Sequence, residues 1–283
     1  MKYDELWRRL TPLYDAREAQ AVVRLVLDEA FHLSLTDVVC GAVERLADAD
    51  AARLEGIMSR LEAAEPVQYV LGSAWFCRRR FAVKPGVLIP RPETEWLIGA
   101  VKAAADTCAR RPVRILDVGT GSGCIAVSAA LCVGDADVEA WDISPQALAI
   151  AQGNAKALGA DVRFLLRDAL NAPHEQRQLD VVVSNPPYVC LAERAQMAPN
   201  VLRHEPHTAL FVPDADPQLF YRAIGTYALS ALRPGGTLLF ECNTLYAADT
   251  ARLLLGQGFA AATVHADCFG KPRFVRAVKA EEA

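Results

Sequence analysis

The sequence lacks several features that mark specialised classes of proteins. Its 283 residues contain no run of about 18 uncharged apolar residues, so no membrane-spanning helix is expected. The first residues mix both charge signs without the apolar core of a secretory signal, which favours a cytoplasmic location. Eight cysteines occur without one Cys-x-x-Cys pair, and we expect them to be reduced residues of the core.

An excess of positive charge is also missing. The formal net charge is −4 and the isoelectric point is about 5.8, so the chain as a whole does not attract polyanions. The run Arg78-Arg79-Arg80 is a local exception, which we interpret as a solvated hairpin tip. No nucleic-acid partner is therefore expected.

Glycine is absent from the first 40 residues, and no strand-like alternation precedes Val67. Four apolar residues share the i, i+3, i+4, i+7 spacing of one buried helix face: Leu54, Ile57, Met58 and Leu61. We predict a helical domain over residues 1–65 that serves in substrate recognition. Residues 66–90 are predicted to form a β-hairpin linker.

Strand-like and helix-like segments alternate through the remainder, residues 91–283. Apolar runs of strand length cover residues 113–118, 138–141, 162–166, 181–184 and 237–241, and helical stretches include 145–158 and 217–232. This alternation indicates an α/β fold with a mostly parallel sheet and helices on both faces. Residues 259–278 are expected to add a closing antiparallel pair.

A glycine-rich turn follows the first of these strands, in the order Asp117-x-Gly119-x-Gly121-x-Gly123. Glycine permits positive φ and close approach to a ligand, and ligands bind at the carboxyl ends of strands in such sheets. The spacing does not fit the dinucleotide fingerprint, since Cys124 stands where a glycine is needed, and no Lys-Ser/Thr pair follows for a phosphate loop. We therefore predict a ligand without a phosphate.

The same arrangement resembles the first motif of class I methyltransferases, which have a Rossmann-like fold and use S-adenosylmethionine. The resemblance makes residues of this turn candidates for cofactor binding: Gly119, Thr120, Gly121, Ser122 and Gly123. Asp142 ends the next strand, where a carboxylate accepts hydrogen bonds from ribose hydroxyls, although it or Ser144 could instead cap the helix at Pro145. Asp168 and Ala169 follow a third strand, where the family binds adenine, but acidic residues after strands are common.

The segment Asn185-Pro186-Pro187-Tyr188 follows another strand. Two prolines fix their φ angles and supply no N–H, so the carbonyls at this strand end become rigid acceptors. The Asn185 side chain adds an oxygen, and together these acceptors suit both hydrogens of a planar NH2 group. Tyr188 is expected to pack against that group. By itself the segment could simply end a strand, but with the glycine-rich turn and Asp142 before it the combination resembles methyltransferases that act on amides or exocyclic amines, a reaction that needs no metal.

Four segments then resemble the release factor glutamine methyltransferase family (PrmC/HemK), over essentially the whole chain. They are Pro-Val-Gln-Tyr-Val-Leu-Gly at 66–72, Val-Leu-Ile-Pro-Arg-Pro-Glu-Thr-Glu at 87–95, Asn-Pro-Pro-Tyr at 185–188 and His-Glu-Pro-His-Thr-Ala-Leu at 204–210. The family methylates the glutamine of the Gly-Gly-Gln loop of class I release factors, leaving S-adenosylhomocysteine.

The resemblance implies a role for each matching segment. Asn185 and the Pro186 carbonyl, with Pro187 and Tyr188, would hold the glutamine amide, and Asn185 would also border the cofactor. Residues 91–95 would border the methionine part of the cofactor, and Glu205 with Pro206 would shape the substrate side. We expect a monomer whose partner is a release factor.

Two departures and three alternatives accompany this interpretation. Residues 241–246 read Glu-Cys-Asn-Thr-Leu-Tyr where the family commonly has Glu-Ile-Gly-x-x-Gln, and Ala169 stands where relatives are often bulky. These put fine contacts in doubt rather than the reaction type. The alternatives are a glutamine methyltransferase of a large-subunit ribosomal protein, an adenine amino methyltransferase of DNA or RNA, and a noncatalytic binding module.

Overall fold

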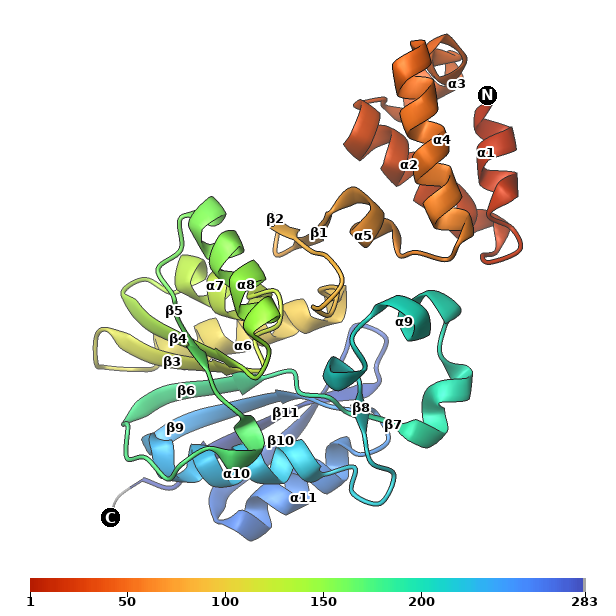
Figure 1. The fold of residues 1–283 in the computed structure, drawn as a ribbon. Helices are drawn as coiled ribbons and strands as arrows, with labels where there is room; N and C mark the ends of the chain where they lie inside the picture. The colour runs from red at the N-terminus through yellow and green to blue at the C-terminus, as the bar shows by residue number, and fades with distance from the viewer. Residues whose placement is uncertain (282–283) are drawn as a thin grey trace. The chain divides into compact units, whose positions relative to one another are not determined.

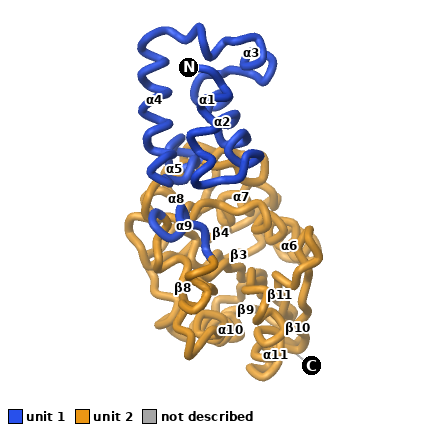
Figure 2. Tube along the Cα trace, turned by 90° about the vertical axis from the view of Figure 1, so that its right-hand side faces the viewer, with its two compact units in different colours: residues 1–73, 197–204 blue, residues 74–196, 205–283 orange. Residues whose placement is uncertain are grey.

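Two compact units make up the chain in the computed structural model, which describes residues 1–281. The first unit holds residues 1–73 together with 197–204, and the second holds residues 74–196 and those from 205 onward (Figure 2). The division after Ser73 falls inside the segment predicted as a linker. Among the described residues, no helix has both the length and the apolar character needed to cross a lipid bilayer.

Helices build the first unit (Figure 1): α1 (Tyr3–Arg9), α2 (Ala16–Phe31), α3 (Leu35–Val39), α4 (Asp48–Glu62), α5 (Val67–Leu71) and α9 (Pro199–His204). Asp15 begins α2 as its N-cap, because its carboxylate accepts a hydrogen bond from the Glu18 N–H at 2.8 Å. The stripe predicted on α4 is confirmed: Leu54, Met58 and Leu61 are fully buried, and Ile57 packs against the same core.

The predicted hairpin occupies only part of residues 66–90. Residues 67–71 form α5, and the pair β1 (Ser73–Phe76) and β2 (Arg79–Ala82) follows. The turn residues Cys77 and Arg78 have φ of +48° and +60°, the left-handed conformation that tight hairpin turns require. Glu95 stabilises this turn by accepting a hydrogen bond from the Cys77 N–H at 2.8 Å.

A seven-stranded sheet forms the centre of the second unit within the described residues, in the order β10-β11-β9-β6-β3-β4-β5. Its strands are β3 (Val113–Val118), β4 (Ala136–Asp142), β5 (Arg163–Leu166), β6 (Leu179–Ser184), β9 (Leu232–Glu241), β10 (Phe259–Ala266) and β11 (Pro272–Lys279). The strands from β9 to β5 run parallel, and β11 pairs antiparallel with both β9 and β10. The predicted parallel sheet and closing antiparallel pair are confirmed.

Helices cover both faces of this sheet (Figure 1), as predicted. One core packs against α6 (Glu95–Asp106), α7 (Cys124–Cys132) and α8 (Pro145–Leu158), and the other packs against α10 (Leu219–Ala231) and α11 (Ala247–Gln257). Successive residues of β6 alternate between them, since Val181 and Val183 lie in the first core and Val182 in the second. A short parallel pair, β7 (Val189–Cys190) with β8 (Phe211–Val212), lies outside the main sheet.

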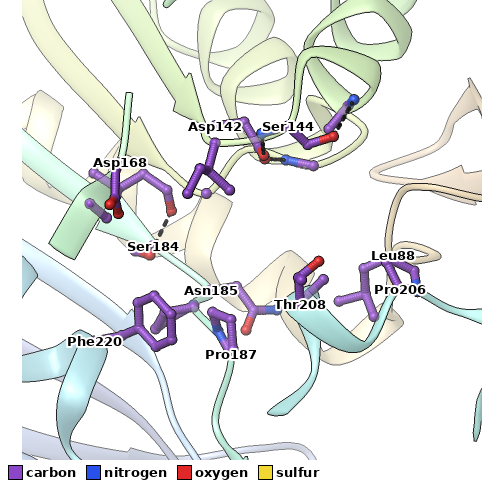
Figure 3. A pocket seen from close by; sticks show the side chains of 18 of the residues that line it. Leu88, Asp142, Ser144, Asp168, Ser184, Asn185, Pro187, Pro206, Thr208 and Phe220 are labelled. Carbon is purple, nitrogen blue, oxygen red and sulfur yellow. Dashed lines mark hydrogen bonds between the residues drawn. The ribbon is translucent and has the colours of Figure 1, made fainter. Parts of the chain in front are cut away.

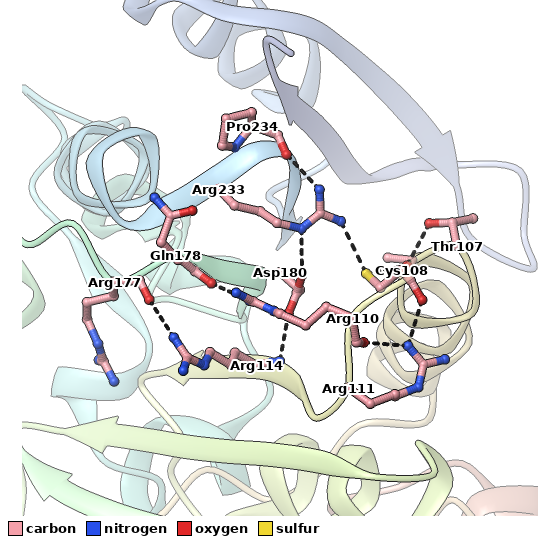
Figure 4. Close-up of polar contacts among 11 residues, drawn as sticks. Thr107, Cys108, Arg110, Arg111, Arg114, Arg177, Gln178, Asp180, Arg233 and Pro234 are labelled. Atoms are coloured by element: carbon pink, nitrogen blue, oxygen red, sulfur yellow. Dashed lines mark hydrogen bonds and ion pairs between the residues drawn. The ribbon is translucent and has the colours of Figure 1, made fainter. Parts of the chain in front are cut away.

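Arginines surround a buried carboxylate near the amino ends of the central strands (Figure 4). Asp180 accepts hydrogen bonds from Arg110 at 2.8 Å, from Arg233 at 2.6 Å and from the Arg114 backbone N–H at 2.8 Å. Burial alone would raise the pKa of Asp180, but these hydrogen bonds outweigh it and lower the pKa below its ordinary value. The ion pairs therefore join β6 to the starts of β3 and β9.

The expectation that all cysteines belong to the core is wrong in part. All eight are free, and Cys108, Cys124, Cys190 and Cys242 are buried. Cys40 and Cys268 are exposed, because each lies at a helix end or loop rather than within an apolar strand or helix.

Candidate active site

A cavity of about 400 Å³ lies at the carboxyl ends of the parallel strands in the second unit. Its walls come from residues after β3, β4, β5 and β6, from the turn at 86–88 and from residues 206–213. Figure 3 shows Asp142 and Ser144 on one side, with Asn185, Pro187 and Thr208 opposite. The volume is within the range of about 300–1,000 Å³ that is typical of small-molecule sites.

The predicted glycine loop joins β3 to α7 at this cavity. Gly119, Gly121 and Gly123 have φ of +76°, +56° and +80°, which glycine adopts without strain. A Cβ on Gly123 would lie 2.9 Å from the Cβ of Ala151, so this glycine also permits the close packing of α7 on α8. Gly119 and Gly121 line the cavity, whereas Thr120, Ser122 and Gly123 fall outside the described lining residues.

Asp117, the last-but-one residue of β3, organises the loop and was not predicted as a site residue. Its carboxylate accepts hydrogen bonds from the Thr120 hydroxyl at 2.6 Å and from the Ala126 N–H at 3.1 Å. Burial raises its pKa to about 7 despite both contacts. Its Oδ1 is buried without a hydrogen-bond partner among the described residues, so one acceptor at this loop is unused.

Asp142 ends β4 and lines the cavity, where the sequence predicted a ribose-binding carboxylate. It accepts hydrogen bonds from the Gly121 N–H at 2.8 Å and from the Ser144 N–H at 2.9 Å, so it connects the glycine loop to the start of α8. Burial raises its pKa above the ordinary value, against those backbone hydrogen bonds. The N-cap of α8 is Ser144, whose hydroxyl accepts from the Ala147 N–H, so Asp142 does not have that alternative role.

Asp168 and Ala169 both line the cavity after β5. The Asp168 carboxylate accepts hydrogen bonds from the Leu170 N–H at 2.9 Å and from the Asn171 side chain at 2.6 Å, and thus caps a short 3-10 helix at 169–171. Phe220 of α10 also lines the cavity, where Figure 3 shows its ring beside Asn185 and Pro187, and it was not predicted from the sequence. Phe220 and Ala169 both pack against the second core of the sheet.

The Asn-Pro-Pro-Tyr segment brings Asn185, Pro186 and Pro187 to the cavity wall. The end of β6 is fixed to β3, because the Ser184 hydroxyl donates to the Val118 carbonyl at 2.6 Å. The Asn185 side-chain nitrogen donates to the Thr94 hydroxyl at 3.3 Å. Its oxygen, Oδ1, is the part of the amide left to accept a hydrogen bond from a ligand.

Tyr188 stands outside the described residues that line the cavity. Its hydroxyl donates to Glu241 at 3.1 Å, and its backbone N–H donates to the Leu210 carbonyl at 3.2 Å. Asn243, one of the departures from the family pattern, donates to the Tyr188 carbonyl at 3.2 Å. These contacts fix the exit of the diproline segment, and the packing of the Tyr188 ring against a ligand stays a prediction.

Glu205 and Pro206 also differ in position. Pro206 lines the cavity, but the Glu205 side chain is buried and accepts hydrogen bonds from Arg91 at 2.5 Å and from the Ile89 N–H at 3.1 Å. This ion pair joins the segments on two sides of the cavity. Residues 91–95 themselves are absent from the described lining residues, where Gly86, Val87 and Leu88 occur instead.

Family models match parts of both units of the chain. The Methyltransferase small domain family matches residues 94–208, and the PrmC N-terminal domain family matches residues 8–72. A release factor glutamine methyltransferase of Bacteroides thetaiotaomicron is 44% identical over 270 residues, which cover 95% of each chain. The chain belongs to the release factor glutamine methyltransferase family. Another member, from Flavobacterium psychrophilum, is 38% identical over 94% of each chain.

Solved structures show the fold of the methyltransferase unit of this family member. The Thermus thermophilus 16S rRNA N2 G1207 methyltransferase, solved with AdoMet and guanosine, superposes with a TM-score of 0.52 at 20% identity, over 73% of this chain and 49% of that one. A methyltransferase from Pyrococcus furiosus superposes with a TM-score of 0.50 at 16% identity, over 71% and 88%. The predicted class I methyltransferase fold is thus confirmed.

Proposed function

We propose that this chain uses S-adenosylmethionine to methylate the side-chain amide nitrogen of the glutamine in the Gly-Gly-Gln motif of class I peptide chain release factors. The observation that carries the proposal is the strand end at Asn185, whose side-chain oxygen is free to accept at a cavity wall shared with Pro186 and Pro187. Membership of a family whose curated relatives are named for this activity supports it.

The lining residues fit this cofactor. Gly119 and Gly121 allow close backbone approach, and Asp142 offers a carboxylate for ribose hydroxyls. Asp168, Ala169 and Phe220 provide the polar and apolar surfaces expected around adenine. When bound, the cofactor supplies an electrophilic methyl group on a sulfonium and becomes S-adenosylhomocysteine.

The difficulty of this reaction is that an amide nitrogen is a poor nucleophile. Its lone pair is delocalised, so the protein must stabilise the positive charge that develops on nitrogen as the new bond forms. Asn185 Oδ1 and the Pro186 carbonyl accept hydrogen bonds from the two N–H groups and provide that stabilisation. The rigid diproline fixes both acceptors, so the nitrogen is aimed before the reaction begins.

We further infer that the first unit contacts the release factor. Its helix α9 leads along the chain directly into Glu205 and Pro206, and Pro206 lines the cavity. We expect one copy of the chain to act on one release factor.

A methyl-transfer assay tests the proposal. The chain is incubated with radiolabelled cofactor and a purified release factor, either wild type or with the Gly-Gly-Gln glutamine replaced by alanine. A large-subunit ribosomal protein and total nucleic acid serve as competing acceptors. We expect label in the wild-type factor alone, within the peptide that contains Gly-Gly-Gln.

Two results would contradict the proposal. Equal labelling of the alanine variant would exclude this glutamine as the acceptor. Labelling of nucleic acid or of the ribosomal protein, with the release factor untouched, would assign the same strand end to a different NH2 group.

A further inference from the structure

A chain of hydrogen bonds lies behind Asn185, outside the cavity wall. The Asn185 amide donates to the Thr94 hydroxyl at 3.3 Å, and that hydroxyl donates to Glu241 Oε2 at 2.7 Å. The other oxygen of Glu241 accepts from the Tyr188 hydroxyl at 3.1 Å. Thr94 and Glu241 are 2% and 1% exposed, so water does not compete for these contacts.

Which group donates and which accepts in these hydrogen bonds follows from counting hydrogens. An ionised carboxylate only accepts, and a threonine hydroxyl has a single hydrogen, so Thr94 donates to Glu241 and receives the Asn185 N–H on its lone pair. A half-turn of the Asn185 amide would place its oxygen against the Thr94 oxygen with no hydrogen between them. The Asn185 oxygen is therefore held toward the cavity.

We propose that Thr94 and Glu241 are positioning residues that set the direction of the Asn185 amide, and thereby make the site accept substrates that present a planar NH2 group. This inference rests on the proposed function, because only a substrate that donates hydrogen gains from an oxygen at this position. A substrate that placed a hydrogen-bond acceptor at this position would be repelled by Asn185 Oδ1.

The protonation of Glu241 also controls whether the oxygen or the NH2 of the Asn185 amide faces the cavity. Burial raises the pKa of Glu241, while hydrogen bonds from Thr94 and Tyr188 and the positive charge of Arg273 oppose that rise, and Glu93 adds to it. A protonated Glu241 donates to Thr94, which then donates to Asn185 Oδ1 and turns the NH2 of Asn185 toward the cavity. Glu241→Gln imitates that reversed state, since its NH2 donates to Thr94.

Three variants test the proposal by single-turnover methyl transfer at saturating cofactor and release factor. Thr94→Ser keeps the hydroxyl and should transfer within about threefold of wild type. Thr94→Val, of nearly the same shape, and Glu241→Gln should be slower by about 10–100-fold, as for other residues that orient a site ligand. Cofactor affinity should stay within about threefold in all three. Wild-type transfer by Thr94→Val would overturn the proposal.

A second measurement needs no substrate. The side-chain NH2 signals of Asn185, assigned by their loss in Asn185→Asp, are recorded by NMR for wild type, Thr94→Ser and Thr94→Val. We expect one NH2 proton to be shifted downfield and slow to exchange in the first two proteins, and to lose both properties in Thr94→Val. Unchanged signals in Thr94→Val would overturn the positioning role, even if that variant were inactive. If the NMR signals are as expected but the wild-type chain does not methylate the release factor, the proposed function is contradicted and the positioning role is not.

Discussion

The two ends of the parallel strands hold their carboxylates in opposite surroundings. Toward the amino ends, Asp180 is paired with Arg110 and Arg233, and Glu139 is paired with Arg163 and Arg177. In both, burial raises the pKa but the hydrogen bonds and charges of the partners outweigh it, so the pKa is lowered.

At the carboxyl ends, three carboxylates of the strands have neutral hydrogen-bond partners, whereas Glu205, which lies outside the sheet, is paired with Arg91. Asp117, Asp142 and Glu241 accept hydrogen bonds from hydroxyls and backbone N–H groups, and burial raises the pKa of each one, that of Asp117 to about 7. A carboxylate that is buried without a cation costs stability, whereas the arginines beside Asp180 and Glu139 offset that cost and occupy the oxygens that a ligand could use. The difference shows that carboxylate oxygens at the amino ends are occupied by arginines, whereas the carboxyl ends, where we propose the active site, keep carboxylates with raised pKa.

The largest expected effect is on turnover, at the carboxyl end. Asn185→Ala should slow methyl transfer by about 100-fold or more, because one of the two acceptors on the substrate amide is lost. Cofactor affinity, measured by calorimetry, should change by less than about threefold. A matching loss of cofactor affinity would show that Asn185 is chiefly a cofactor ligand. Asp180→Asn, at the other end of the same strand, is the control and should keep wild-type turnover per folded molecule.

The next effect is on stability, at the amino end. Asp180→Ala should lower the free energy of unfolding by about 2 kcal/mol, since a charged acceptor is removed from a buried position. The value is below that of a fully buried pair because Arg110 and Arg233 keep 37% and 27% of their side chains exposed. Chemical denaturation at neutral pH measures it. A loss of unfolding free energy as small as that of an exposed ion pair would contradict the proposed difference between the two ends of the strands.

A smaller effect is expected on cofactor affinity. Asp142→Ala should raise the dissociation constant for S-adenosylmethionine about tenfold, through loss of a ribose acceptor and of the hydrogen bond to Gly121. Asp137→Ala, which changes an exposed residue of the same strand β4, is the control and should leave the constant unchanged. An unaltered constant in Asp142→Ala would show that the ribose assignment is wrong.

The smallest effect sharpens the comparison through pH. The lowered pKa of Asp180 contributes stability that is present above its ordinary value of about 3.9 and is lost as the pH falls through the folded-state value. Asp117 has the opposite sign: its folded-state pKa of about 7 makes the unfolding free energy fall as the pH rises from about 4 to 7.

We expect each slope to reach at most about 1.4 kcal/mol per pH unit, the limit for a single proton, measured by denaturation across a pH series. Asp117→Asn should remove the decline toward pH 7 and keep the loss in acid, whereas Asp180→Asn should do the reverse. The same pH profile for both variants would mean that the two ends do not differ in this way.

Local sequence patterns were sufficient to predict most of the fold. The predicted helix 145–158 agrees with α8 at both ends, because Ser144 caps it and Gly159 ends it in the left-handed conformation. Helix α11 was not among the helical stretches named from the sequence, and its N-cap residue, Tyr246, makes no side-chain capping bond. Residues 197–204 join the first unit through long-range packing, which no local pattern reveals.

The residues of the candidate site also divide into those that local motifs predict and those that only the folded chain brings together. Gly119, Asp142 and Asn185 are strand-end residues with strong local motifs, and all three line the cavity. Thr94 and Glu241 are 147 residues apart in sequence, as Arg91 and Glu205 are 114 apart, so their pairing depends on the folded sheet. For that reason sequence analysis could give Glu205 a place on the substrate side by resemblance but could not reveal its pairing with Arg91.

The most direct test of the account is a crystal structure of the chain with S-adenosylhomocysteine and a release factor, or a peptide containing its Gly-Gly-Gln loop. We predict that the glutamine side-chain nitrogen lies about 2.7–3.2 Å from both Asn185 Oδ1 and the Pro186 carbonyl oxygen. A glutamine bound elsewhere, with the NH2 of Asn185 turned toward the cavity, would contradict it.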